Sequence, residues 1–182
     1  MSQNKASARY AKSLIDLSIE QKAFEEIRND MVLIEQTIDQ NSLLEAILQN
    51  PVIPLGKKSG ILDQIFGDKI HAVTRSFLKL VISKGRSAIL FDTTKAFITQ
   101  YNLIKGIITA EVSSASALTD ENRAEIIAVV TKETGANQVL IKEKVNEDLI
   151  GGFILKVGDK QFDASIAGSL NKLKKELSLV TM

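Results

Sequence analysis

The stretch Gln100–Ser114, QYNLIKGIITAEVSS, contains the change of pattern that decides the fold. Up to Gly106 the apolar residues recur every three or four positions, which is the spacing of one helix face. After Gly106 they alternate with polar residues, as in a strand with one buried face. The alternation sets Ile108, Ala110 and Val112 against Thr109, Glu111 and Ser113. We therefore place a domain boundary here, between residues 1–105 and residues 106–182.

The helical spacing before the boundary extends from Ala6 to Ile104, with breaks at glycine, proline or polar pairs. Ser42 and Glu45 have the spacing of a capping box, which predicts the start of a short helix. Gly67 and Gly85 each follow a helical run, where glycine typically ends a helix in the left-handed conformation. These breaks predict a bundle of six helices joined by short loops.

The segment after the boundary mixes strands with helices. Thr119 is a suitable cap for a helix that ends at Gly135, and two further alternating stretches predict strands at 139–145 and 153–157. A turn at 158–159 then leads to a fourth strand, "KQF". The predicted order is βαβββα, so the chain is mainly α, with a six-helix bundle followed by a small α/β domain. Asp163 can cap the final helix, which is lined by Ile166, Leu170, Leu173 and Leu177.

Composition excludes several classes of protein. The 182 residues carry a net charge of +1, too small for a long-range field that would attract nucleic acid or anionic lipid. There is no cysteine, which excludes disulfides and thiolate chemistry. No apolar run approaches the roughly 20 residues that span a bilayer. We expect a chain without direct membrane insertion, which associates with a membrane only through partners.

Glycine-rich segments suggest a phosphate site that their context does not support. A phosphate loop needs glycines at the start of a helix, whereas Gly151 and Gly152 precede a strand. The segment GKKSG at residues 56–60 has lysine at position 58, where a P-loop needs serine or threonine. We interpret Gly151, Gly152 and Gly158 as structural glycines that allow turns.

Catalytic and metal chemistry find little support. His71 is the only histidine, and no potential ligand lies four residues after it, so a packing or surface role is favoured. We interpret the carboxylate pairs of the sequence as solvent-exposed charges and not as acid–base catalysts. We predict no catalytic residue, no metal site and no cofactor.

The first and fifth helices carry more apolar surface than a bundle helix needs. On an ideal wheel, the first helix and the helix from about Lys69 to Lys84 each have an apolar arc of roughly 200°, about twice the usual stripe. Two such helices can form a groove for an apolar helix of another chain. Alternatively, both helices are central in the bundle and enclosed by their neighbours. The two arcs contain Ala8, Tyr10, Ala11, Leu14, Ile15, Leu17 and Ile19, and Ile70, Val73, Phe77, Leu78, Leu80, Val81 and Ile82.

The segment LIGGFILKVGDKQFDASIAGSLNKLKKEL at 149–177 closely resembles the C-terminal signature of the ATP synthase delta subunit family, called OSCP in mitochondria. ARYAKSLIDLSIEQ at 8–21 resembles the first helix of the family, and FLKLVISKGRSAIL at 77–90 its fifth helix and following turn. The resemblance covers nearly the whole chain and implies the same two-part fold. It also implies a non-catalytic stator subunit in the peripheral stalk of a proton-translocating F-type ATP synthase.

The resemblance assigns partners to both parts. It implies that residues 1–105 bind the N-terminal segment of an alpha subunit on the catalytic head, through a groove between the first and fifth helices. It implies that residues 106–182 bind the C-terminal ends of b-type stalk subunits, through Ile166, Leu170, Leu173 and Leu177. On the groove it places Tyr10, Ala11, Leu14, Ile15, Phe77, Leu78, Val81 and Ile82.

The same resemblance implies a monomer within the complex, located peripherally at the cytoplasmic face of the bacterial inner membrane. The lack of a presequence favours the bacterial type. A nucleic-acid-binding or other protein-interaction regulator is the alternative, and it would need a clustered basic face. A small-molecule enzyme would need a convergent polar pocket, for which the sequence offers no residues.

Overall fold

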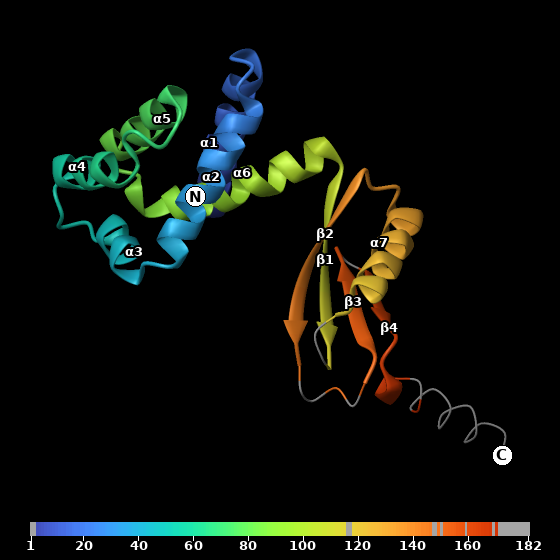
Figure 1. The fold of residues 1–182 in the computed structure, drawn as a ribbon. Coiled ribbons are helices and arrows are strands. Elements are labelled where there is room, and N and C mark those ends of the chain that lie inside the picture. The colour runs from blue at the N-terminus through green and yellow to red at the C-terminus, as the bar shows by residue number, and fades with distance from the viewer. Residues whose placement is uncertain are drawn as a thin grey trace. The chain divides into compact units, whose positions relative to one another are not determined.

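The computed structural model of the 182-residue chain describes residues 3–115, 118–146, 149, 151–158, 160–168 and 170. Its first part contains six α-helices, as the sequence predicts, with one 3₁₀ turn before the last of them (Figure 1). The elements are α1 (Gln3–Glu20), α2 (Phe24–Asp39), α3 (Ser42–Gln49), α4 (Leu55–Phe66), α5 (Ala72–Ser83), η1 (Ser87–Ile89) and α6 (Leu90–Lys105).

The start of α5 is fixed by contacts that helical spacing does not reveal. The Asp30 carboxylate on α2 is buried and accepts hydrogen bonds from the His71 backbone N–H, at 2.9 Å, and from the Thr74 hydroxyl, at 2.6 Å. The imidazole Nδ1 of His71 caps the helix by accepting from the Val73 N–H, at 3.3 Å. The helix therefore starts at Ala72 and not near Lys69, and the single histidine has a capping role.

Two other helix ends differ from the sequence prediction. The cap of α3 is Asn41 and not Ser42, because the Asn41 side chain accepts from the Leu44 N–H. Gly67 ends α4 in a right-handed conformation (φ −37°), so it is no left-handed terminator. Gly85 does have the predicted left-handed conformation, with φ of 68°.

An aromatic cluster joins α2 to α6. The rings of Phe24 and Tyr101 lie 4.7 Å apart between centroids, and Phe97 contacts Phe24 edge-on. The Tyr101 hydroxyl donates to Glu25 at 2.5 Å. Burial, together with the hydrogen bond to Glu25, raises the pKa of Tyr101 to about 12.

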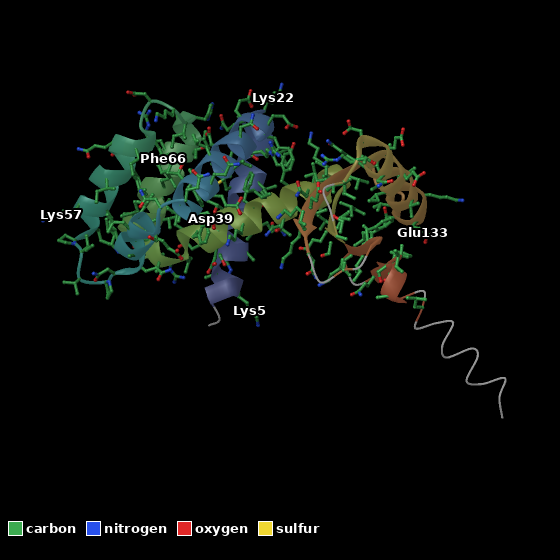
Figure 2. The ribbon with its side chains drawn as sticks, turned by 60° about the horizontal axis from the view of Figure 1, so that its bottom comes forward. Lys5, Lys22, Asp39, Lys57, Phe66 and Glu133 are labelled. Atoms are coloured by element: carbon green, nitrogen blue, oxygen red, sulfur yellow. The ribbon has the colours of Figure 1, made fainter. Side chains whose placement is uncertain are left out.

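A buried lysine joins three further elements of the bundle. Lys58 of α4 donates from Nζ to the Leu48 carbonyl at the end of α3 and to the Ser87 hydroxyl of η1, both at 2.8 Å. Burial lowers the pKa of Lys58 below its ordinary value of 10.5. Its neighbour Lys57 points to solvent, and Phe66 of the same helix is fully buried (Figure 2).

The second part is a four-stranded sheet with one helix on its apolar face. Its elements are β1 (Ile107–Ser114), α7 (Asp120–Thr134), β2 (Gln138–Val145), β3 (Phe153–Val157) and β4 (Lys160–Asp163). The strand order is β2-β1-β3-β4 (Figure 1), in which β1 and β2 are parallel and the other pairs antiparallel. A parallel pair needs a crossover connection, and α7 supplies it. The predicted alternation of β1 is confirmed, because Ala110 and Val112 are fully buried and Glu111 is exposed.

The register brings the apolar residues of three strands to the face that α7 covers. Ala110 of β1 pairs with Ile141 of β2 and Val157 of β3, and Val112 pairs with Leu155. Ile126 and Val130 of α7 complete this core. The core lies entirely within residues 103–182, one of the two compact units into which the chain divides, Met1–Asn102 and Leu103–Met182.

Both ends of α7 are as predicted, and Glu143 ties its start to the sheet. Thr119 caps the helix by accepting from the Asn122 N–H, and Gly135 ends it in the left-handed conformation. The Glu143 carboxylate accepts from the Leu118 N–H at 2.6 Å and from Arg123 of α7 at 3.0 Å. This carboxylate therefore holds the loop before α7 against β2.

The segment after β4 packs against the paired glycines Gly151 and Gly152 before β3. The Ile166 N–H donates to the Gly151 carbonyl at 3.0 Å, and the Ala164 N–H donates to the Phe153 carbonyl at the same distance. Gly152 has φ of 78°, and a Cβ there would lie 2.3 Å from the Ala164 carbonyl oxygen. The second glycine is required both by its conformation and by this close approach of backbone.

We predict that Gly152→Ala lowers the free energy of unfolding by at least about 2 kcal/mol, because it combines a left-handed alanine with a backbone clash. Gly60→Ala is the matched control. Gly60 lies inside α4, and a methyl group added there would enter open space, so alanine should stabilise the chain by about 0.5–1 kcal/mol. Urea unfolding of both variants measures the two changes, and equal effects would contradict the prediction.

The lowered pKa of Lys58 predicts a pH-dependent stability. Between the lowered pKa and 10.5 the unfolded chain binds more protons than the folded chain, so stability rises with pH in this window. In Lys58→Met this contribution should be absent, and Ser87 can still donate to the Leu48 carbonyl, as it does at 2.7 Å. Urea unfolding near neutral pH and near pH 10 measures the difference. A parallel pH dependence in both proteins would contradict it.

Candidate functional site

An open apolar trough lies between α1 and α5. Leu17 of α1 lines one side, and Val73, Phe77 and Leu80 of α5 line the other, together with Ala72 and Ser76. The hollow has a volume of about 320 Å³. Leu17 and Leu80 are 38% and 49% exposed, so both leucines present apolar surface to solvent. We call this surface the α1/α5 trough.

The trough follows from the way α5 is buried. Thr74, Leu78 and Val81 point into the bundle and are at most 3% exposed. The residue before each of these is apolar, and Val73, Phe77 and Leu80 form a second stripe at helical spacing. The bundle covers the first stripe fully and the second only in part, since Val73 and Phe77 are half-buried and Leu80 is exposed. The helix thus keeps apolar surface on a face that the described part of the chain covers only partly.

One aromatic contact crosses between the two helices. The rings of Tyr10 and Phe77 meet edge-to-face with 6.4 Å between centroids. Beyond this pair, on the side away from Leu17, a second hollow of about 300 Å³ is lined by Ala6, Arg9, Tyr10, Ser13 and Arg86. The guanidinium carbon of Arg86 lies 5.9 Å from the Tyr10 ring centroid. The two hollows therefore differ in chemistry, one apolar and one cationic.

The eight predicted groove residues divide into two groups. Tyr10 and Phe77 are half-buried, and each lines one of the two hollows. The other six are at most 3% exposed and pack in the core of the bundle, so they do not line the open surface: Ala11, Leu14, Ile15, Leu78, Val81 and Ile82.

Three residues of the trough were not chosen from the sequence, although they belong to the predicted arcs. Leu17, Val73 and Leu80 occupy the part of each arc that neighbouring helices leave uncovered. A helical wheel defines the width of an arc, but the exposed part depends on where α2 and α4 pack. The sequence signal that pointed to these residues was the excess width of the apolar arc on each helix.

The predicted stalk residues are only partly described. Ile166 and Leu170 are 48% and 57% exposed. Leu173 and Leu177 lie outside the described residues. Gly151 and Gly158 behave differently from Gly152: a Cβ at Gly151 would press on the Ile166 side chain, whereas Gly158 has φ of 57° and open space around it.

Within the described ranges, no three histidine or acidic side chains gather where they could hold a metal ion. None of the helices in this part of the chain is both long enough and apolar enough to cross a membrane.

A helical bundle with an open apolar trough, followed by a small α/β unit, defines a two-part protein with an apolar surface exposed on its helical part. A sequence model of the ATP synthase delta (OSCP) subunit family matches residues 6–177. The chain belongs to this family, as the resemblance implied. It is similar to the ATP synthase subunit delta of Cytophaga hutchinsonii, with 36% identity over 98% of this chain and 97% of the relative. The delta subunit of Bacillus licheniformis is 32% identical, over 98% and 96%.

A solved structure supports the fold independently. A chain of the Toxoplasma gondii mitochondrial ATP synthase hexamer superimposes with a TM-score of 0.74 over 94% of this chain and 96% of that chain, at 18% identity. The delta (OSCP) subunit is a structural subunit of ATP synthase, so the protein is a non-catalytic subunit of that complex.

Proposed function

We propose that the protein is a stator link, which joins the N-terminal segment of an alpha subunit on the catalytic head to the C-terminal ends of the b-type peripheral stalk. The α1/α5 trough is the observation that supports the proposal, because it is an apolar surface between two helices that the bundle leaves open. Such a link resists the torque that the rotor exerts on the head.

The chemistry of the trough favours a helical ligand. An amphipathic helix places apolar side chains at intervals of three and four residues, and Val73, Phe77 and Leu80 present the same intervals. Each apolar side chain that the two helices bury contributes about 25 cal/mol per Å² before ordering costs are subtracted. Two helices docked in this way form a joint whose strength depends mainly on apolar contact.

The second unit supplies the stalk contact in this proposal. Ile166 and Leu170 are exposed apolar residues four positions apart, at the start of the final helix. Leu173 and Leu177 continue the same spacing in the sequence. In the proposal, Ile166 and Leu170 pack along the b-type helices. Residues 1–105 and 106–182 would then have separate partners.

The proposal places the protein at the cytoplasmic face of the bacterial inner membrane, as one copy in each synthase. Its membrane association is peripheral and depends on the head and the stalk. Relatives of bacterial origin and the membership of the synthase family support this location.

We predict that Leu80→Glu in the full-length chain weakens binding of a peptide from the N-terminus of the cognate alpha subunit at least about tenfold. The substitution removes a half-exposed leucine from the trough and places a charge where apolar contact is needed. Val52→Glu is the control, since Val52 is 84% exposed and does not line the trough. Calorimetric titration measures both, and unchanged affinity of Leu80→Glu would exclude the trough as the binding site.

We predict that Leu170→Glu weakens capture of a C-terminal peptide of the b-type subunit without lowering the melting temperature. Leu170 is 57% exposed, so its replacement leaves no cavity. Val129→Glu, at an exposed position of α7, is the matched control. If the two variants capture the peptide equally well, the final helix is not the stalk site.

A further inference from the structure

The cationic hollow beside the trough contains two arginines from different elements. Arg9 comes from the first half of α1, and Arg86 from the turn after α5. Ala6, Tyr10 and Ser13 complete the lining, so a hydroxyl and an aromatic ring accompany the two guanidinium groups. Both arginines are exposed. We call this surface the arginine hollow.

No carboxylate of the described residues neutralises these arginines. The ion pairs of this part of the chain involve Arg75, Lys79 and Arg123, and neither Arg9 nor Arg86 takes part in one. The guanidinium carbon of Arg86 lies over the Tyr10 ring, 5.9 Å from its centroid, in the range of a cation–π interaction. Two positive charges with unused donors therefore face the same hollow.

The position of Arg86 is fixed by the backbone at the end of α5. Gly85 is left-handed, its N–H donates to the Ile82 carbonyl at 2.8 Å, and the Arg86 N–H donates to the Val81 carbonyl at 3.1 Å. This pair of bonds is a Schellman motif, which sets the direction of the residue after the glycine. The Tyr10 ring then holds the side chain from the α1 side. The backbone motif and the Tyr10 ring limit where the guanidinium can lie, which lowers the ordering cost of binding.

We infer that the arginine hollow is a subsite for an acidic side chain of the helix that occupies the α1/α5 trough. The inference rests on the proposed function, since it assigns the chemistry of the ligand at that same surface. A carboxylate fits because a guanidinium offers paired N–H donors that match its two oxygens. The apolar trough supplies affinity, and the hollow selects the direction and register of the docked helix.

The geometry sets the spacing of the acidic residue. Arg9 and Leu17 lie eight residues apart on α1, which is about 12 Å along the helix axis. A docked helix that runs beside α1 covers the same distance in about eight residues. The ligand should therefore carry an aspartate or glutamate about two turns away from the apolar residue that contacts Leu17. A helix docked in the reverse direction would bring that acid to the apolar end of the trough.

The test is a double-mutant cycle with the full-length chain and the N-terminal peptide of the cognate alpha subunit. Each aspartate and glutamate of the peptide is replaced singly by asparagine or glutamine, and each peptide is titrated into wild type, Arg86→Met and Arg9→Gln. At one position the replacement should weaken binding to wild type at least about threefold, and this loss should disappear with Arg86→Met. The loss should also shrink at 1 M salt.

Lys12→Gln is the matched control, because it removes one charge from α1 at a position outside the hollow. With Lys12→Gln, replacement of the acidic peptide residue should still weaken binding about threefold. With Arg86→Lys, the same replacement should weaken binding by a smaller factor. If the wild-type peptide binds and Leu80→Glu weakens it, but no acidic position couples to Arg9 or Arg86, the subsite is excluded and the trough stands. If the peptide does not bind wild type at all, the proposed function fails and the subsite with it.

Discussion

The hydrogen bonds of the buried Asp30 carboxylate are the interaction on which the α1/α5 trough depends. The carboxylate accepts from the backbone and from a side chain in the first turn of α5, so it determines both where this helix starts and which way it is turned. This rotation of the helix about its axis sends one apolar stripe of α5 into the bundle and leaves the stripe beside it partly exposed. Gly85 defines the other end of the same helix. The trough and the arginine hollow are thus consequences of how one helix is held at its two ends.

Much of this architecture could be predicted from local patterns. The six helices, the change of period at Gly106 and the helix between Thr119 and Gly135 all depend on residues close together in the sequence. The start of α5 could not be predicted in this way, because it depends on Asp30, which is 41 residues before His71. Local spacing extends a helix until a breaker appears, whereas here a distant carboxylate binds the N-cap residue His71 and Thr74 in the first turn.

The same difference between local pattern and long-range packing applies to the α1/α5 trough. The wide apolar arcs of the first and fifth helices indicated surface beyond the needs of a core, and the bundle encloses one part of each arc and leaves another part exposed. Leu14 and Leu78 are enclosed by the bundle, whereas Leu17 and Leu80 remain open. Residues of one type and one periodicity are separated only by the packing of their neighbours. The role of Arg86 could not be predicted for a different reason. A single arginine after a glycine forms no sequence pattern, and only the fold places Arg9 and Tyr10 beside it.

The strand order leaves β2 with one edge that no other described strand covers. An eight-residue edge of this kind can recruit a strand from another molecule and seed fibrils. Lys142 and Lys144 alternate along it, both exposed, and their charges oppose such stacking. The chain therefore carries its own protection against strand addition along β2.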